Sequence, residues 1–526
     1  MNNFIKRIHS TFFLTNIEKK IYKYFKKDFT TSSSSNIILL QCVEDLYYFG
    51  LFGKIVKSLK EKDDIQAKQF VIRNLTVGAS KSFSGLLKGF LFNNKVRDNK
   101  WIKLYSSYCN GVAYRHENST NVFFDIKAFF QAYKIVQNIK TKQDLLNLTI
   151  NDIKVGDLIY DSYLRYKPAP SVDIDDFYLC IVIWQCIRNI EMTQNYFNEY
   201  NPQILLTSYS TYIQHGITVR VAIKFDTKVY SFGNNQNITK LLTKDDFYHT
   251  AKFSTYNSDF NNFSEEEKTK YYQESKIALD NRLNGNQDIA TSYMKESAYK
   301  INNDIEIPNI KDHVIIFLHD FFDSPHVYGD MVFTDFLEWV EYTINILEKE
   351  NIPYSLKPHP NEISDSAKVT KELKIKYPKA NFISTKITNK QLVDARISIG
   401  ISVYGTVAHE LVYMGVPVIL CASNPHSSYD FCYEARTKDE YKSYIKNHKN
   451  LNVLNKEKEV LSFYYMHNNK SKRMYNIMKN IIKLRKHNYS LSSKFNYDEY
   501  IHLLEKIEKE ISSNLTFKNL AKGLEI

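Results

Sequence analysis

The sequence predicts an α/β protein with two Rossmann-like, doubly wound domains and C-terminal helices. Three observations lead to this fold class. The chain has 526 residues, of which 43% are hydrophobic and 24% charged, a globular balance over a length that exceeds one ordinary core. Short apolar runs alternate with helical periodicity between residues 313 and 421, and a similar strand-helix unit opens the chain at residue 36. Such alternation is typical of a parallel sheet covered by helices.

The second half of the chain carries the clearest pattern. Strands are expected at 313–318, 353–357, 381–384, 397–401 and 416–421, and helices at 331–349, 364–376, 388–395 and 404–413. In the first of these helices, Val332, Phe336 and Val340 fall on one stripe, which is typical of a helix packed on a sheet.

The first half is less regular. Strands are expected at 36–43, 122–124 and 203–207, and helices at 50–60, 129–136, 176–197 and from about 217. Residues 250–304 are polar and rich in Asn, Gly and Asp, which indicates an interdomain region. The predicted domains are an N-terminal α/β domain at 1–305, a Rossmann-like domain at 306–480, and helices at 481–526 that brace the two.

Charge and cysteine content exclude several classes of protein. The net charge is +12, but 70 basic and 58 acidic residues are interspersed, so we expect no nucleic-acid partner. The six cysteines have neither zinc-ligand spacing nor a CxxC pair, and we interpret them as buried thiols in a reducing compartment. Neither an apolar run of membrane-spanning length nor a secretory signal occurs, so a cytoplasmic location is expected.

The N-terminal segment 1–30 differs from the even charge pattern elsewhere. It alternates large apolar side chains with lysines, and two interpretations remain open. The favoured one is a helix packed on its own domain with a lysine-rich outer face. The other is association with the anionic inner face of the cytoplasmic membrane.

One candidate binding element is Lys357-Pro358-His359-Pro360, at the end of an expected strand. A proline holds the residue before it in an extended conformation, so His359 is expected at a fixed place on the carboxyl edge of the sheet. Its imidazole can donate to a phosphate oxygen, while Lys357 balances the phosphate charge.

A second element follows the strand expected at 397–401. Gly405 precedes a helix whose first free N–H groups suit a phosphate, and Ser402 and Thr406 add hydroxyl groups. No lysine follows the glycine, which excludes a P-loop. Glu410, one turn into this helix, can accept two ribose hydroxyls. The structural alternative is a Ser/Thr cap with a surface glutamate.

Two more polar loops follow expected strands on the same edge. His319 and Asp320 end the first strand of the second half, and Asn424 and His426 follow the last. Four polar loops at one carboxyl edge predict a ligand crevice, which we interpret as a nucleotide-sugar site.

These motifs resemble those of a known group of enzymes. His359-Pro360, with Ser402 and Thr406, is similar to the His-Pro and Ser/Thr elements of GT-B glycosyltransferases, specifically the bacterial capsule and surface-polysaccharide transferases that include Kdo transferases and polysialyltransferases. The segment 405–419 resembles a wider GT-B signature in which a glutamate holds ribose, a role that falls on Glu410. The resemblance covers about 310–435.

The resemblance implies a GT-B-like fold with two domains facing a cleft, and an inverting, metal-independent glycosyltransferase without a cofactor. The donor would be CMP- or UDP-linked, and the acceptor a capsule or other surface polysaccharide or a glycolipid. The acceptor domain must supply a general base. The candidates are Asp161, which we expect in a loop near a strand end, then Asp157 and His215.

Other functions remain open on the same motifs. A CDP-glycerol-type phosphotransferase or a sugar-nucleotide epimerase would use a similar nucleotide site. A non-catalytic subunit of the polysaccharide assembly machinery could keep the nucleotide fold without its chemistry.

Overall fold

The computed structural model describes most of the chain and divides it into two compact units. The described residues are 13–27, 29–43, 45–61, 64–71, 99–115, 122–232, 239–250, 254–286, 305–359, 364–453, 456–470 and 496–513, with 288, 299, 476, 477 and 480. Unit 1 comprises residues 1–162, 174–249 and 473–526, and unit 2 comprises residues 163–173 and 250–472.

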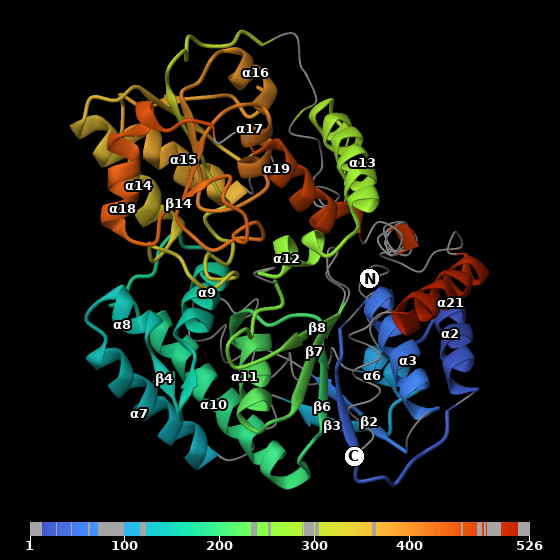
Figure 1. The fold of residues 1–526 in the computed structure, drawn as a ribbon. Coiled ribbons are helices and arrows are strands. Elements are labelled where there is room, and N and C mark those ends of the chain that lie inside the picture. Colours follow the sequence, from blue (N-terminus) through green and yellow to red (C-terminus); the bar gives the residue numbers. More distant parts are fainter. Residues whose placement is uncertain are drawn as a thin grey trace, which may run out of the picture. The chain divides into compact units, whose positions relative to one another are not determined.

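Unit 2 contains a six-stranded, fully parallel sheet (Figure 1). Its strands are β9 (Val314–Phe317), β10 (Tyr354–Lys357), β11 (Asn381–Phe382), β12 (Ile399–Ile401), β13 (Val418–Leu420) and β14 (Tyr433–Glu434). Their spatial order is β11-β10-β9-β12-β13-β14, which is the Rossmann order. The order reverses between β9 and β12, where such sheets bind their ligands.

Helices cover both faces of this sheet. They are α12 (Tyr256–Asn261), α13 (Glu265–Leu283), α14 (Phe336–Lys349), α15 (Ser364–Lys376), α16 (Asn389–Asp394), α17 (Val407–Tyr413), α18 (Lys438–Lys446) and α19 (Glu457–Tyr464), with the short helices η3 (His448–Asn450) and η4 (Tyr465–Asn469). Val314 and Ile316 pack with α14 and α15, whereas Ile315 and Phe317 pack with α13 and α17. Burial on both faces explains why β9 (VIIF) and β13 (VIL) are apolar throughout.

Unit 1 contains a second sheet with the same order in its first five positions. Its strands are β1 (Ile37–Gln41), β2 (Gln66–Val71), β3 (Val112–Arg115), β6 (Ile204–Thr207), β7 (Lys228–Phe232) and β8 (Thr239–Leu242), arranged β3-β2-β1-β6-β7-β8. The first five are parallel, and β8 runs antiparallel to β7. The order reverses between β1 and β6. A separate hairpin joins β4 (Thr149–Ile150) to β5 (Ile153–Lys154).

The helices of the first half and the C-terminus complete the description. They are α2 (Asn16–Lys26), α3 (Leu46–Lys60), α6 (Asn99–Tyr105), α7 (Val122–Asn138), α8 (Lys142–Leu146), α9 (Gly156–Tyr166), α10 (Phe177–Tyr200), η2 (Tyr212–Gly216), α11 (Ile217–Lys224) and α21 (Tyr497–Ser513). The C-terminal α21 packs on α3 in unit 1, where the Tyr500 hydroxyl donates to the Leu46 carbonyl at 2.6 Å.

The predicted fold class is confirmed, because both units carry Rossmann-like parallel sheets and a helix follows at the C-terminus. Several predictions of local structure are wrong. The strand expected at 122–124 is the first turn of α7, and the loop expected at 155–161 is mostly α9. The interdomain role of 250–304 stays a prediction; within that region, α13 packs Leu279 and Leu283 into the core of unit 2.

The N-terminal helix α2 is packed on unit 1. Ile21 and Phe25 are buried in its core, while Lys19, Lys20 and Lys23 are exposed, as the favoured interpretation expects. Residues 1–12 lie outside the described residues. Within the described part of the chain, no helix is long and apolar enough to cross a membrane.

Candidate functional site

The strand-order reversal of unit 2 brings two predicted residues together. His319 follows β9 and Ser402 follows β12, and their side chains meet at 3.1 Å between Nε2 and Oγ. The Ser402 hydroxyl also lies 3.1 Å from the Tyr404 carbonyl oxygen, to which it can donate. The two polar side chains therefore meet where a Rossmann-like sheet holds its ligand.

Aromatic packing fixes the His319 ring. Phe336 stacks on it at 4.7 Å between ring centroids with an 11° interplanar angle, and Tyr404 contacts it at 4.9 Å. Burial, together with the smaller effect of the neighbouring His359, lowers the pKa of His319 to about 3. His319 is therefore a neutral imidazole at pH 7, held in one orientation.

Gly405 lies against this imidazole. Its φ is +120°, and a Cβ built on it would lie 3.9 Å from Cε1 of His319. Side-chain-bearing residues avoid this conformation, so the glycine lets the backbone turn next to the ring. The turn leads into α17, whose N-cap Thr406 makes no side-chain capping hydrogen bond.

The end of β10 supplies Lys357 and His359. Lys357 is buried and donates to the Ile387 carbonyl at 2.5 Å, and burial lowers its pKa to about 8. Its ammonium group thus has a structural partner. His359 is half-buried, and burial lowers its pKa, while Asp320 acts in the opposite direction. Pro360 lies outside the described residues.

Asp320 organises the loop after β9. Its Oδ1 accepts from the Phe322 N–H at 3.1 Å and from the Ser366 hydroxyl at 2.6 Å. The Ser366 hydroxyl oxygen also accepts from the Phe321 N–H at 3.1 Å. Asp320 therefore ties the loop after β9 to α15. This structural role does not move Asp320 away from His359, whose pKa it raises.

Glu410 lies in a buried ion pair instead of facing an open crevice. It is 2% exposed, and its two carboxylate oxygens accept from Arg282 and Tyr299. Arg282 also donates to Asp288 at 2.7 Å, and so does the Tyr464 hydroxyl. Burial raises the pKa of Glu410, against the effect of Arg282. A ribose could bind Glu410 only by displacing these partners, so the ribose role stays a prediction.

Sequence reasoning missed Arg282 and Tyr299. They precede Glu410 by 128 and 111 residues, in a polar region that carries no motif. The available signal in the sequence was a single arginine beside Leu279 and Leu283 in a helical segment. An arginine among apolar residues is rarely buried without an acidic partner.

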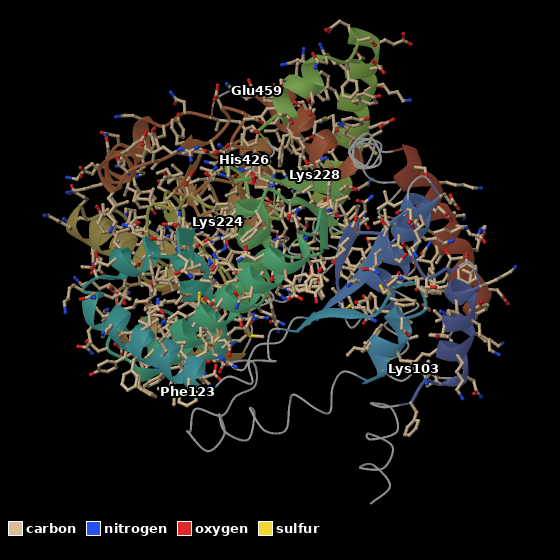
Figure 2. The ribbon with its side chains drawn as sticks, turned by 90° about the horizontal axis from the view of Figure 1, so that it is seen from below. Lys103, Phe123, Lys224, Lys228, His426 and Glu459 are labelled. Atoms are coloured by element: carbon tan, nitrogen blue, oxygen red, sulfur yellow. The ribbon has the colours of Figure 1, made fainter. Side chains whose placement is uncertain are left out.

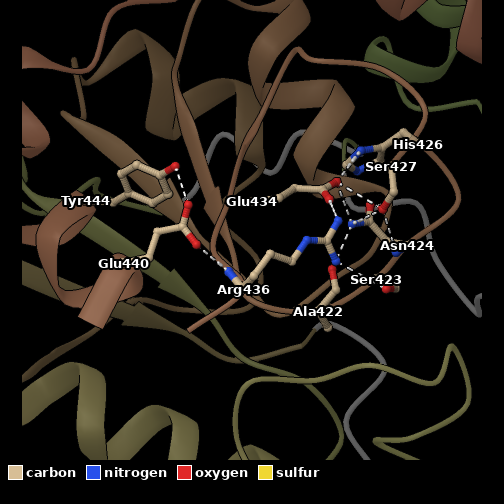
Figure 3. Close-up of polar contacts among 9 residues, drawn as sticks. All are labelled: Ala422, Ser423, Asn424, His426, Ser427, Glu434, Arg436, Glu440 and Tyr444. Carbon is tan, nitrogen blue, oxygen red and sulfur yellow. Dashed lines mark hydrogen bonds and ion pairs between the residues drawn. The ribbon is translucent and has the colours of Figure 1, made fainter. Parts of the chain in front are cut away.

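The loop after β13 is held by its own hydrogen bonds (Figure 3). Asn424 donates from Nδ2 to the Ala422 carbonyl at 3.1 Å and to Glu434 at 3.0 Å, and Glu434 pairs with Arg436 at 2.7 Å. His426 is 2% exposed, and burial lowers its pKa to about 3. Neither Asn424 nor His426 is brought into contact with His319.

Three histidines gather around Phe463 in unit 2. The ring centroids of His409, His426 and His467 lie 5.2, 5.5 and 5.1 Å from that of Phe463. Both ring nitrogens of His409 are buried without a hydrogen-bond partner among the described residues, whereas Nδ1 of His426 lies 3.6 Å from a carboxylate oxygen of Glu434. The described residues contain no group of His, Cys, Asp or Glu that could hold a metal ion.

The predicted base candidates lie in unit 1. Asp157 is buried and accepts from both terminal nitrogens of Arg220, at 2.6 and 2.5 Å, and from the Tyr248 hydroxyl at 2.8 Å. Asp161 is 3% exposed and lies within α9. The loop expected around Asp161 is absent because residues 156–166 form that helix, so Asp161 is not at a strand end.

His215 lies at the strand-order reversal of unit 1. Oε1 of Gln41, at the end of β1, accepts from the Ser208 N–H at 2.7 Å, so the Gln41 atom that meets His215 is the amide nitrogen. This nitrogen donates to Nδ1 of His215 at 2.5 Å, and burial lowers the pKa of His215 to about 4. The neutral ring then carries its hydrogen on Nε2. This geometry suits donation of a hydrogen bond more than removal of a proton.

Comparison with known proteins gives only distant likenesses. No protein-family model matches the chain, and no curated protein matches it. Similar solved structures include a UDP-GlcNAc 2-epimerase of Methanocaldococcus jannaschii (9% identity, 84% of this chain and 99% of that chain, TM-score 0.23) and a UDP-bound transferase of Siraitia grosvenorii (10%, 90% and 99%, TM-score 0.21). The Anabaena protein HepE, solved with UDP and glucose, matches at 10% identity over 91% and 100% of the chains with a TM-score of 0.24.

TM-scores of this size carry no argument about function. The assignment of two Rossmann-like sheets rests on the strand order of each unit. This order is consistent with a GT-B-like fold, and none of the comparisons shows a specific family.

Proposed function

We propose that the chain is a nucleotide-sugar-dependent enzyme, a glycosyltransferase whose donor nucleotide binds at the carboxyl edge of the unit 2 sheet. The observation that carries this proposal is the meeting of His319, Ser402 and Gly405 at the strand-order reversal between β9 and β12. A diphosphate bound there would lie beside the Gly405 backbone turn, within reach of the two side chains.

The histidines at this site are suited to a negatively charged ligand, because they can gain protons when it binds. Burial lowers the pKa of His319 to about 3, so its imidazole is neutral at pH 7, and burial also lowers the pKa of His359, so the two rings avoid forming a cluster of buried positive charges. A bound diphosphate would raise both pKa values and draw protons onto the rings. Charge-assisted hydrogen bonds of this kind are stronger than neutral ones.

Sugar transfer would use this binding to stabilise the leaving group. The acceptor oxygen forms a bond to the anomeric carbon, the bond from that carbon to the phosphate oxygen breaks, and the nucleotide leaves with the electron pair. Imidazole N–H groups at the diphosphate stabilise the charge that develops on it. The acceptor hydroxyl loses its proton to a base, which this proposal does not assign.

A matched pair of serines tests the site. Ser402 bonds to His319 beyond the carboxyl end of β9, while Ser355 bonds to His313 at the other end, with 2.9 Å between Oγ and Nδ1. Calorimetric titration with UDP, CMP, CDP and GDP should show one nucleotide that binds the native chain. Ser402→Ala should weaken that nucleotide about tenfold or more, as expected for the loss of a hydrogen bond to a charged group.

The Ser355→Ala control should leave the affinity within about twofold, since it removes a similar bond away from the site. Equal losses in both variants would contradict the proposed location. Incubation with the matching nucleotide sugar separates the chemistries. Nucleotide release that requires a saccharide acceptor supports transfer, whereas interconversion of the sugar without an acceptor would contradict it and indicate an epimerase.

A further inference from the structure

A pocket of about 440 Å³ lies in unit 1, between α2, α3 and Tyr108, and includes the residues that directly follow the two helices. We call it the α2–α3 pocket. Its volume falls within the roughly 300–1,000 Å³ of small-molecule sites. It is also many times the roughly 30 Å³ that one water molecule occupies in the liquid. The pocket therefore has room for an organic molecule and not only for a single ion.

The α2–α3 pocket is at the amino end of the unit 1 sheet. Helix α3 joins two parallel strands and runs back along the sheet, so Lys60 in its last turn is near the start of β2. Gln66, the first residue of β2, donates from Nε2 to the Ser32 carbonyl at 2.9 Å, so the segment after α2 reaches the same end. Gln41 and His215 meet at the opposite, carboxyl end. The pocket is therefore separate from the strand reversal of unit 1.

One wall of the pocket is apolar. Phe25, Val56 and Tyr108 line it and are buried, and the ring centroids of Phe25 and Tyr108 lie 5.3 Å apart. The Tyr108 hydroxyl donates to the Phe49 carbonyl at 2.7 Å, so Tyr108 offers its ring to a ligand. The apolar body of a ligand would lose its contact with water on this wall.

Three lysines of α3 also line the pocket. Lys54, Lys57 and Lys60 are spaced by three residues, which places them along one side of the helix. Lys54 is buried and donates to Glu508 at 2.9 Å and to the Tyr24 hydroxyl at 2.8 Å. The other carboxylate oxygen of Glu508 lies 4.0 Å from Nζ of Lys57. One carboxylate thus serves two ammonium groups.

Lys60 shares an aromatic ring with a fourth lysine. Nζ of Lys60 lies 4.3 Å from the ring centroid of Phe29, and Nζ of Lys26 lies 4.2 Å from the same centroid. Lys60 is half-buried and donates to the Thr30 carbonyl at 2.9 Å. Burial lowers the pKa of Lys60, and the charge of Lys26 also acts to lower it. An anion beside these two ammonium groups would offset their repulsion.

The described part of the chain shows no ion pair for Lys26 or Lys60. Glu61 lines the pocket and is exposed, and Asp64 is exposed and accepts from the Ser32 hydroxyl at 2.7 Å. Asp64 acts to raise the pKa of Lys60 without bonding to it. Lysines stabilise the last turn of any helix, but this effect does not explain two cations on one ring.

We propose that the α2–α3 pocket is a second ligand site of the chain, which binds a small aromatic compound that carries an anionic group. Lys57 and Lys60 hold the anionic group, and the aromatic ring lies on Phe25, Val56 and Tyr108. An inorganic ion alone would leave the apolar wall unused. An uncharged compound would leave the ammonium groups without a countercharge.

Covalent labelling of the full-length chain with pyridoxal 5′-phosphate tests the proposal, because this probe has an aromatic ring and a phosphate. A deprotonated lysine amine adds to its aldehyde carbon and water leaves, and borohydride then reduces the imine to a stable secondary amine. Peptide mass spectrometry measures the label at each lysine. Figure 2 labels Lys103, an exposed lysine of α6 in the same unit. Lys60 should be labelled about tenfold more than Lys103, because charged hydrogen bonds hold the phosphate in the pocket.

Two variants and a second probe show whether the pocket recognises the phosphate. Lys57→Gln should reduce the labelling of Lys60 about fivefold or more, because it removes a cation that faces the phosphate. Lys103→Gln is the matched control and should leave the labelling of Lys60 unchanged. Pyridoxal, which lacks the phosphate, should lose most of the preference for Lys60. Circular dichroism should show that both variants stay folded, since both side chains reach solvent.

Competition separates a soluble ligand from a lipid headgroup. Phenyl phosphate should protect Lys60 from the label at lower concentration than inorganic phosphate, which lacks the ring. Vesicles that contain phosphatidylglycerol should give no protection.

Four results would overturn the proposal. The first is equal labelling of Lys60 and Lys103 by pyridoxal 5′-phosphate. The second is an undiminished preference for Lys60 with pyridoxal, which would show that the anionic group plays no part. The third is unchanged labelling of Lys60 in Lys57→Gln. The fourth is protection by the vesicles and not by phenyl phosphate, which would assign these lysines to lipid contact.

Discussion

The first five strands have the same spatial order in unit 1 and unit 2, but different residues lie where the strand order reverses. In unit 1, Gln41 occupies that point and bonds to Thr207, Ser208 and His215. In unit 2, the His319 imidazole lies 3.1 Å from the Ser402 hydroxyl at that point, beside the turn at Gly405. The same topology thus gives a point closed by an amide network in one unit and a point lined by groups suited to an anion in the other.

The two units resemble each other in a second feature. Each contains a buried carboxylate that the sequence had nominated for chemistry, and each holds it with one arginine and one tyrosine. Asp157 accepts from Arg220 and Tyr248 in unit 1, and Glu410 accepts from Arg282 and Tyr299 in unit 2. These two acidic residues therefore have partners that account for their burial.

The largest effect should come from breaking one of these ion pairs. Asp157→Asn leaves the buried Arg220 guanidinium without a countercharge and should cost about 3–5 kcal/mol in the free energy of unfolding. Glu410→Gln should cost less, because Arg282 keeps its 2.7 Å pair with Asp288. Urea unfolding measures both. Asp152→Asn, at a side chain 95% exposed, is the control and should change little.

A stable Asp157→Asn protein that has lost activity would instead support a catalytic role for Asp157. Such a result would remove the parallel between the two units.

The second largest difference should appear in the stability of the two units at acidic pH. Burial lowers the pKa values of His319, His426 and His467 to about 3 in unit 2, and of His249 to about 3 and His215 to about 4 in unit 1. The unfolded chain binds more protons than the folded chain below its own histidine pKa of about 6.5, so this stability is complete above that pH and is lost as the pH falls towards the folded-state values.

Each histidine that stays neutral at pH 5 should cost about 2 kcal/mol relative to pH 7. Unit 2 holds more of them, so its free energy of unfolding should fall further. Single-tryptophan variants give the readout, with Trp339 reporting on unit 2 and Trp184 on unit 1. A greater loss in unit 1 would contradict the assignment of these buried imidazoles.

Nucleotide affinity should distinguish the two ends of β9. His319→Ala should weaken the nucleotide about 10- to 100-fold, as expected for the loss of a hydrogen bond to a phosphate. His313→Ala, at the opposite end of the same strand, should leave the affinity within about twofold. Affinity for the native chain should also rise as the pH falls from 8 to 6, because the bound anion favours protonated His319 and His359. An affinity independent of pH would argue that the anion binds elsewhere.

A pair of glycines should give the smallest effect. Gly405 and Gly415 have φ values of +120° and +86°, so alanine at either position strains the backbone by about 1–3 kcal/mol. Both variants should therefore lose a similar amount of stability in thermal unfolding. Only Gly405→Ala should also weaken the nucleotide, because only this turn lies next to His319. Weaker binding in Gly415→Ala would show that the strain acts through the fold.

The helices and strands of unit 2 were predicted from the sequence far better than those of unit 1. The helix expected at 364–376 is found at those residues, and the strands expected at 353–357 and 397–401 appear with ends shifted by at most two residues. These strands and helices alternate regularly along the chain. In unit 1, β2 and β7 were missed, since QAKQFV and KVYSF mix polar and apolar residues and lack the continuous apolar run of a buried strand.

The candidate site was predictable only where it depends on strand ends. His319, His359, Ser402 and Gly405 follow strands that periodicity reveals, and the parallel sheet brings those ends to one edge. The partners of Asp157 and Glu410 were not predictable, because Arg220 and Arg282 approach through tertiary packing over 63 and 128 residues of chain. A single sequence carries no periodicity across such distances.

Hydrogen exchange with and without nucleotide tests the central claim most directly, because it reports on both strand reversals in one experiment. The native full-length chain is compared alone and with the nucleotide that binds most tightly in the titration. The account predicts slower exchange in peptides that cover 317–322 and 402–408 of unit 2, with no change at 41–46 and 207–215 of unit 1. Slower exchange at the unit 1 segments, with unit 2 unaffected, would contradict it.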